Sequence, residues 1–246
     1  MKSYQVFENA QPIKEVELDT PIPEGDEVLI KTIACGVCHT DIHIHDGFFD
    51  IGNGKKMASR MVQPLAMGHE VFGEVVSFGQ NVRDIEVGKK FVVYPWIGCG
   101  ECEACKADNE HECGPLTAEN IGVAVDGGYG EYVLVKHSKY LFDAGNTPDD
   151  LAGSYACRGL TAYSSLKKAN LKPNENKLVI ISAGGLGLLA LKIAKAAFNV
   201  SPIVVDIDDS KLEIAKAAGA SEVINSSHEG AKKRIMDLTE GGATTV

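Results

Sequence analysis

The pattern of apolar residues changes near residue 150 of this 246-residue chain, and this change constrains the fold more than any other feature. Before it, short β-branched runs such as EVLIKTIA and FGEVVSFG are separated by Gly, Pro and Asp, which predicts a β-rich, barrel-like domain over residues 1–150. After it, apolar strands alternate with amphipathic helices, which predicts a right-handed parallel βαβ sheet over residues 151–246. The sequence therefore predicts an α/β protein of two domains.

The second domain is expected to begin with a helix from Leu151 to Ala169 and a turn at LKPNEN, residues 171–176. The predicted strands are Lys177–Ser182, Ile203–Asp206 and Glu222–Ile224, and the predicted helices are Gly185–Phe198, Ser210–Ala218 and His228–Thr239. These elements make one mononucleotide half of a doubly wound sheet, and a further strand starts at EGGATTV. We therefore expect a fragment of a longer enzyme; the alternative is a short form whose open sheet edge is covered by a partner.

Composition excludes several classes of protein. A formal net charge of -10 argues against a nucleic-acid surface, because phosphate binding needs clustered Lys and Arg. No apolar run is long enough to span a bilayer, and the N-terminal residues lack the apolar core of a signal peptide, so we expect a cytoplasmic protein without a membrane partner. In that compartment the seven cysteines indicate metal ligands or free thiols better than disulfides.

Four of these cysteines form the knuckle, C-x2-C-x2-C-x7-C, which consists of Cys99, Cys102, Cys105 and Cys113. Four thiolates from one short loop can complete a tetrahedral shell on Zn²⁺, and a site with no open position is structural. An iron–sulfur cluster is the alternative, although the spacing differs from that of ferredoxins. The knuckle also permits a zinc-ribbon nucleic-acid binder, which the acidic charge opposes.

A second reactive stretch is CGVCHTDIH, from Cys35 to His43. Its C-x-x-C could be a redox pair or half of a zinc site, since both need two nearby thiols. Taken alone, Cys157 is predicted to be a small buried apolar residue and His69 a core or surface histidine. Spacing leaves these alternatives open.

Several motifs occur in a characteristic order: CGVCHTDIH, GHEVFGEVVSFG, the knuckle, GGYGEYVLV, ACRGLTAY and AGGLG. In this combination the chain resembles the zinc-dependent alcohol dehydrogenases of the medium-chain dehydrogenase/reductase family. The resemblance implies a GroES-like catalytic domain followed by a Rossmann-like NAD-binding domain. It implies oxidation of an alcohol to an aldehyde or ketone by hydride transfer to NAD, and the reverse reaction. It also implies that the full-length protein is a homo-oligomer, either a dimer or a tetramer. A polyol or cyclic-alcohol dehydrogenase and a catalytically silent zinc- or nucleotide-binding protein are the alternatives.

The same resemblance implies two zinc ions per chain, one structural in the knuckle and one catalytic. The implied catalytic ligands are Cys38, His69 and Cys157, with Glu70 beside the metal. Asp41 corresponds to the carboxylate that orients the ligand histidine.

The other implied roles belong to the neighbours of these ligands. Thr40 and His43 correspond to a proton relay, and His39 to a basic group near the cofactor pyrophosphate, whereas Cys35 has no implied role. Trp96 either lines the substrate pocket or is a core aromatic residue. The segment of residues 48–64 is longer than in most family members, and we expect it to form a flap that selects the alcohol.

A glycine-rich turn follows the first predicted strand of the second domain. The turn Ser182-Ala183-Gly184-Gly185-Leu186-Gly187 matches G-x-G-x-x-G except that Ser182 replaces the first glycine. Gly184, Gly185, Leu186 and Gly187 are therefore expected to hold the pyrophosphate at the helix N-terminus. About twenty residues on, Asp206 is expected to bind the ribose hydroxyls and to favour NAD over NADP, so that an Asp206→Gly variant gains relative NADP use. The alternative role of a helix cap is better filled by Asp208 or Asp209.

Overall fold

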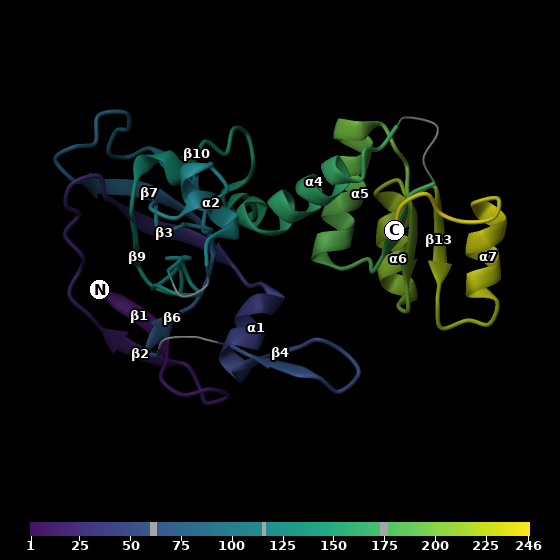
Figure 1. Cartoon of the computed structure of the whole chain (residues 1–246), viewed down its shortest axis with the longest axis horizontal. Coiled ribbons are helices and arrows are strands. Elements are labelled where there is room, and N and C mark those ends of the chain that lie inside the picture. Colours follow the sequence, from purple (N-terminus) through teal and green to yellow (C-terminus); the bar gives the residue numbers. More distant parts are fainter. Residues whose placement is uncertain (60–62, 115–116, 173–176) are drawn as a thin grey trace. The chain divides into compact units, whose positions relative to one another are not determined.

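The computed structural model describes residues 1–59, 63–114, 117–172 and 177–246 (Figure 1). These residues form two compact units, Met1–Cys157 and Arg158–Val246. The first unit contains mainly β-strands and the second alternates strands with helices, so the predicted α/β fold class is confirmed.

The sequence predicted a domain boundary at residue 150. In the structure the first unit extends past this position, to Cys157. A helical turn, α3 (Asp149–Ala152), and the following 3-10 turn, η3 (Gly153–Ala156), contact strands of the first unit. Gly153 lies so close to Glu70 that a Cβ atom there would overlap the Glu70 carbonyl oxygen. This packing places Cys157 in the same unit as the N-terminal half of the chain.

An antiparallel five-stranded sheet forms the centre of the first unit, with the strand order β10-β8-β7-β3-β9. Its alternating β-branched residues bury one face in a core that includes Val28, Ile30, Val71 and Val75. A three-stranded sheet, β2-β1-β6, and the hairpin β4–β5 complete the strands in the described part of the first unit. The bounds are β1 (Lys2–Val6), β2 (Lys14–Glu17), β3 (Val28–Gly36), β4 (Phe48–Asp50), β5 (Lys56–Ala58), β6 (Leu65–Ala66), β7 (Glu70–Phe78), β8 (Lys90–Val93), β9 (Tyr132–Val135) and β10 (Leu141–Phe142).

The pairing of β3 with β7 brings two distant segments together. Gly36, the last residue of β3, lies opposite Glu70, the first residue of β7. A Cβ atom on Gly36 would overlap the Glu70 carboxylate, so only glycine permits this approach. Cys38, two residues beyond β3, therefore comes close to His69, directly before β7.

Short helices connect these strands, and α1 (His39–Asp46) carries Thr40, Asp41 and His43. Helix α1 begins directly after Cys38, which is its N-cap, and ends at Gly47 in a left-handed conformation with φ 82°. Its first turn is closed by the Asp41 carboxylate, which accepts a hydrogen bond from the Cys38 backbone N–H. The bounds are α1 (His39–Asp46), α2 (Glu103–Lys106), η1 (Glu110–Glu112) and η2 (Ser138–Tyr140).

The second unit is a parallel sheet with the order β11-β12-β13, and Leu178 also forms a parallel bridge with Thr245. Buried residues of α5 and α6 pack with Val204 on one face, and Ile235 of α7 packs with Ile203 on the other. This is the predicted doubly wound arrangement. The bounds are α4 (Arg158–Lys168), β11 (Val179–Ile181), α5 (Gly185–Phe198), β12 (Ile203–Asp206), α6 (Asp209–Ala217), β13 (Glu222–Asn225) and α7 (Ala231–Leu238).

Two predicted helical segments are present but differ in detail from the expectation. The predicted helix Leu151–Ala169 is divided into α3, η3 and α4, because Cys157 has φ -118° and ψ -73° and leaves the helical path. Helix α7 begins three residues after the expected His228, because the Asn225 side chain accepts the Ser227 N–H and holds a turn there. Residues 173–176 of the predicted LKPNEN turn lie outside the described residues. No helix in the described parts of the chain has the length and apolarity needed to cross a membrane.

Candidate active site

Four side chains from three separate segments meet in the first unit. The ligand atoms of Cys38, His69, Glu70 and Cys157 all lie within 4.8 Å of one another. The Cys38 and Cys157 sulfurs are 3.9 Å apart, although 119 residues separate them in the sequence. Cys38 caps α1, His69 and Glu70 stand at the start of β7, and Cys157 lies between η3 and α4. The three predicted ligands and the predicted neighbouring carboxylate are thus brought together.

These four residues fit a zinc ion. His69 is fully buried, yet its Nε2 has no hydrogen-bond partner among the described residues. A buried polar atom without a partner is costly, and a metal bond would remove that cost. Zn–S bonds of about 2.3 Å in a tetrahedral shell place two sulfurs about 3.8 Å apart, close to the spacing of Cys38 and Cys157.

Asp41 supports this cluster from within α1. Its side chain is 2% exposed, and Oδ1 lies 3.2 Å from His69 Nδ1. The backbone N–H groups of Cys38 and Gly68 donate to the carboxylate at 2.8 Å and 3.3 Å, and the Tyr129 hydroxyl donates at 3.2 Å. Asp41 therefore fixes the His69 ring and leaves Nε2 facing the sulfurs.

Tyr129 was not singled out by the sequence, although it lies within the GGYGEYVLV motif. Burial and the neighbouring Asp41 carboxylate raise the pKa of Tyr129, so its hydroxyl stays protonated and continues to donate. The only signal in the sequence was an aromatic residue with a polar tip in a glycine-rich turn, which does not reveal its partner.

The cluster stabilises a thiolate. The hydrogen bond with Cys157 lowers the pKa of Cys38 to about 3, against the effect of burial, and His69 and Thr40 lower it further. The same contact raises the pKa of Cys157. Burial favours the neutral His69 ring, but the nearby Asp41 carboxylate and Cys38 sulfur outweigh burial and raise its pKa to about 9. A thiolate beside a positively charged ring is the charge arrangement that a bound cation would replace.

The predicted relay residues lie along α1. Thr40 donates hydrogen bonds to Cys38 from its backbone and side chain. The His43 ring is stacked on the His39 ring, with 4.6 Å between the two ring centroids. The Phe49 ring is a second neighbour, and its centroid lies 5.0 Å from that of His43. Thr40 is therefore directly next to the cluster, and His43 lies one turn further along the helix.

Two other residues flank the cluster differently. The Trp96 ring is 5.6 Å from the His69 ring, so it borders the cluster. Cys35 is absent from the cluster and lies next to Gly128 and Gly68, where a Cβ atom would come within 2.6 Å and 2.8 Å of its sulfur. Burial raises the pKa of Cys35 to about 12, so it is an ordinary protonated thiol.

The segment of residues 48–64 contains the hairpin β4–β5, with Phe48 opposite Ala58 and Phe49 opposite Met57. Its base is closed by a hydrogen bond from the Ser59 N–H to the Gly47 carbonyl. Residues 60–62 of this segment lie outside the described residues. That the segment selects the alcohol stays a prediction.

The knuckle cysteines form a second cluster, whose sulfurs also lie within 4.8 Å of one another. Sulfur–sulfur distances are 3.4 Å for Cys102–Cys105, and 3.9 Å for Cys99–Cys105 and Cys102–Cys113. Backbone N–H groups of Glu101 and Cys102 donate to Cys99 and lower its thiol pKa to about 6. Four converging sulfurs with amide donors around them fit a closed zinc site.

Glu110 attaches the knuckle to the rest of the first unit. It accepts hydrogen bonds from the Gly98 N–H at 3.0 Å, from Lys139 Nζ at 2.6 Å and from the Tyr140 hydroxyl at 2.5 Å. Burial alone would raise its pKa, but these donors keep the pKa lowered. Glu110 was not identified from the sequence, because two of its three partners, Lys139 and Tyr140, lie about thirty residues away.

The glycine-rich turn lies between β11 and α5 in the second unit. Ser182 has φ 89°, a conformation that glycine adopts without strain, and its hydroxyl accepts the Gly184 N–H at 3.3 Å. Gly184 is the N-cap of α5, so Gly185, Leu186 and Gly187 form the first helical turn, whose N–H groups have no acceptor within the helix. These amides can bind a phosphate group.

Two further side chains reach this turn. Asp206 Oδ2 accepts the Ala183 N–H at 2.6 Å, and its Oδ1 accepts the N–H groups of Ile207 and Asp208. Asp208 is the N-cap of α6, as the alternative assignment anticipated. Arg158, which the sequence did not single out, has its guanidinium beside Gly185, where a Cβ atom would lie 2.8 Å from Nη1.

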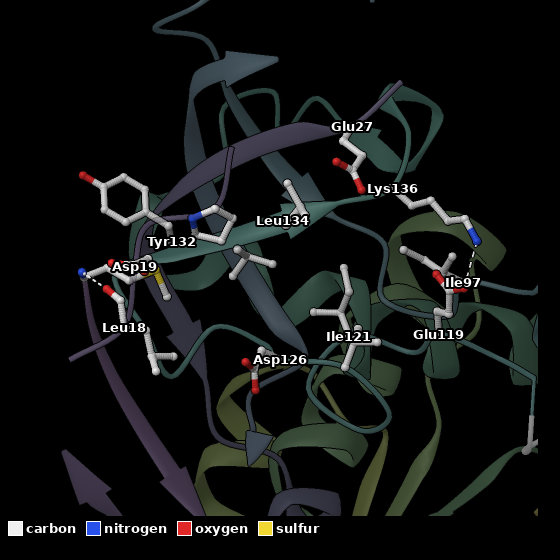
Figure 2. Close-up of a pocket in the computed structure, with 14 residues that line it drawn as sticks. Leu18, Asp19, Glu27, Ile97, Glu119, Ile121, Asp126, Tyr132, Leu134 and Lys136 are labelled. Atoms are coloured by element: carbon white, nitrogen blue, oxygen red, sulfur yellow. Dashed lines mark hydrogen bonds and ion pairs between the residues drawn. The ribbon is translucent and has the colours of Figure 1, made fainter. Parts of the chain in front are cut away.

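A separate hollow of about 410 Å³ lies on the first unit (Figure 2). Apolar residues such as Ile97, Ile121 and Leu134 line it, and Asp19 and Glu27 stand at its rim. None of the predicted site residues lines this hollow. The metal-ligand clusters are therefore distinct from it.

Comparison with known proteins agrees with this geometry. The family model described as alcohol dehydrogenase GroES-like domain matches residues 24–145, and the model described as zinc-binding dehydrogenase matches residues 185–246. A NAD-dependent alcohol dehydrogenase of Sulfurisphaera tokodaii is 38% identical over the whole chain, which spans 70% of that protein. An L-threonine 3-dehydrogenase of Pyrococcus abyssi is 37% identical over 94% of the chain, which spans 63% of that protein.

A solved structure gives the same result for the fold. The alcohol dehydrogenase of Aeropyrum pernix superposes with a TM-score of 0.81 at 27% identity. The match covers 98% of this chain and 69% of the Aeropyrum protein. The chain thus spans about two thirds of the length of the proteins it resembles.

Proposed function

The chain belongs to the zinc-binding alcohol dehydrogenase family, and on this premise we propose that it oxidises an alcohol to an aldehyde or ketone with NAD, and catalyses the reverse reaction. The observation that carries the proposal is the convergence of Cys38, Cys157 and the buried, unbonded Nε2 of His69. Three ligands leave the fourth position of a tetrahedral ion for water or substrate, as in catalytic zinc sites.

A zinc ion held by these residues supplies Lewis acidity that lowers the pKa of an alcohol, while NAD accepts the hydride. The protein groups have separate tasks. Cys38, Cys157 and His69 hold the ion, and Asp41 keeps His69 in the tautomer with Nε2 free to bind. Glu70 adds a buried carboxylate within reach of the same position.

We assign the proton path to Thr40 and His43. Thr40 donates to Cys38 and so lies within hydrogen-bond distance of the ligand shell. His43 is half-buried one turn further along α1, with a ring that can accept a proton and pass it to solvent. This arrangement removes the alcohol proton without exposing the zinc ligands to bulk water.

We propose two zinc ions per chain, the second in the knuckle. Its four sulfurs lie within one ligand shell of one another, and no fifth donor is needed. The knuckle has no open coordination position, so its role is structural.

We also propose that NAD is preferred to NADP. The turn Ser182–Gly187 offers amides for the pyrophosphate, and the Arg158 guanidinium lies beside Gly185 of this turn. Asp206 lies at the end of β12, where its negative charge would repel a 2'-phosphate. The alcohol, a cytoplasmic location and a homo-oligomeric state, dimer or tetramer, are further proposals, to be tested by a substrate panel, cell fractionation and light scattering.

The deciding experiment compares two cysteines of CGVCHTDIH. Cys38→Ala should lose one of two zinc equivalents and abolish NADH formation from alcohols. Cys35→Ala should retain both zinc equivalents, because Cys35 lies outside the cluster. Equal zinc content in the two variants would exclude the proposed catalytic site.

A further inference from the structure

The hairpin β4–β5 follows helix α1 directly, and the two elements lie side by side (Figure 1). Gly47 ends the helix in a left-handed conformation and donates hydrogen bonds to the carbonyls of His43 and Ile44. The chain turns at this point, and β4 contacts α1. The hairpin is therefore held next to the helix that carries the predicted proton path.

Neighbouring residues of a strand face opposite sides, and the two phenylalanines of β4 make different contacts. The Phe48 ring lies under the Lys56 ammonium, 3.6 Å from the ring centroid. The Phe49 ring lies 5.0 Å from the His43 ring, tilted by 42°. Only Phe49 thus contacts the imidazole.

Phe49 is also anchored in the core. It packs against a buried cluster of Val6, Ile44, Leu65 and Met67, and Tyr129 packs against the same cluster. Tyr129 in turn donates its hydroxyl to Asp41, which orients His69. One apolar cluster therefore supports both the His43 ring and the residues around the metal ligands.

His43 has two aromatic neighbours. His39 is stacked on it at 4.6 Å with an angle of 15° between the rings, and Phe49 closes the other contact. Between them the imidazole has few rotamers available, so the direction of its nitrogens is set. Without the Phe49 ring, the side chain would gain space to turn.

We propose that Phe49 is a positioning residue, which holds the His43 imidazole in the orientation that accepts a proton from the alcohol through Thr40 and passes it to solvent. This inference rests on the proposed function, because it requires His43 to carry the proton. It adds that the hairpin takes part in proton transfer through one ring.

The test uses the full-length, zinc-loaded enzyme and three changes of the hairpin. Phe49→Leu keeps apolar volume in the core but removes the ring, whereas Phe49→Tyr keeps the ring. Phe48→Leu is the matched control, since it removes a ring from the same strand on the opposite face. The measurements are kcat and KM for alcohol oxidation in low and high concentrations of a small base such as imidazole, the solvent isotope effect, and zinc content.

We expect Phe49→Leu to lower kcat on the order of 10-fold with KM little changed, because a misplaced proton carrier slows transfer without weakening binding. Added base should restore much of the rate, and the solvent isotope effect should rise. Phe49→Tyr should behave as the wild type, and Phe48→Leu should show no rescue by base. Zinc content should be unchanged in all three.

Two outcomes distinguish a failure of this inference from a failure of the proposed function. If His43→Ala is slowed and rescued by base while Phe49→Leu shows no rescue, Phe49 does not position the ring and the inference is overturned. If His43→Ala is neither slowed nor rescued, the proton path itself is wrong. A spectroscopic check is independent of turnover: nitrogen chemical shifts of labelled His43 should show a mixed tautomer population in Phe49→Leu and a single tautomer in Phe49→Tyr.

Discussion

Asp41→Asn is the most informative single change in the first unit, because one buried carboxylate connects the helix cap to the metal ligand. The carboxylate accepts bonds from the Cys38 and Gly68 N–H groups and from the Tyr129 hydroxyl, and it lies 3.2 Å from His69 Nδ1. Asparagine keeps the volume but has one acceptor oxygen and one NH₂ group. About half of these interactions therefore change from attractive to repulsive.

The size of the effect follows from the hydrogen bonds that asparagine cannot accept. A hydrogen bond to a charged acceptor stabilises by about 1.5 kcal/mol or more, so the absence of two such bonds lowers the free energy of unfolding by about 3 kcal/mol. For the metal, removing the carboxylate partner of a ligand histidine weakens affinity by about 10- to 100-fold. Tyr129→Phe removes only one of these hydrogen bonds, and we expect it to lower the free energy of unfolding by about 1.5 kcal/mol.

The assay is zinc release to a coloured chelator, which should report the two proposed equivalents in sequence. The knuckle provides an internal reference, because Asp41 contacts none of its cysteines. In Asp41→Asn one equivalent should be released at lower chelator concentration and the other at the wild-type concentration. Asp126→Asn is the control: Asp126 also accepts a backbone N–H, that of Ala66 at 2.7 Å, but is exposed and away from the ligands. Unchanged release of both equivalents from Asp41→Asn would refute the reasoning.

Three further predictions concern other parts of the molecule. Cys113→Ser should release the knuckle zinc and lower the thermal midpoint of the first unit, while NAD binding, measured by calorimetry, stays within twofold of the wild type. The pKa of Asp206 is lowered, chiefly by the Ala183 N–H, from an ordinary value of 3.8. A carboxyl group whose pKa is lowered by folding stabilises the folded state fully at any pH above its unfolded pKa. The difference in thermal midpoint between wild type and Asp206→Asn should therefore be present at pH 7 and shrink below about pH 3.8. Ser182→Gly should be more stable than Ser182→Ala by about 1 kcal/mol in urea unfolding, because both variants lose the hydroxyl and its hydrogen bond but only alanine keeps the strain at φ 89°; equal stability would contradict this.

Local patterns were enough to predict the second unit. Helix α5 has the expected bounds Gly185–Phe198 and β12 the expected bounds Ile203–Asp206, since buried parallel strands and amphipathic helices have distinct periodicities. The helical stretch expected from Leu151 to Ala169 is interrupted at Cys157, and Gly153 just before it packs against Glu70, a contact across more than eighty residues. Local helix preference cannot show that another strand requires the chain to bend.

The candidate metal site also depends on contacts between residues that are distant in the sequence. The knuckle could be predicted from spacing, because its four cysteines lie in one loop. The cluster of Cys38, His69 and Cys157 could be predicted only by resemblance, since β3–β7 pairing and the packing of η3 bring them together. Tyr129 was missed, because nothing local indicates that its hydroxyl lies beside Asp41.

The sequence predicted the position of Asp206, but it did not predict the hydrogen bonds that Asp206 accepts. Its position after β12 predicted a partner for ribose, and the structure adds that its two oxygens accept three backbone N–H groups, including that of Ala183 in the phosphate-binding turn. The carboxylate therefore holds the turn in place as well as presenting a negative charge. An Asp206→Gly exchange removes both at once, so a variant that fails to gain NADP use could have lost the turn rather than kept its specificity. Asparagine retains an acceptor for Ala183 while removing the charge, and it is the exchange that isolates the repulsion of a 2'-phosphate from the geometry of the turn.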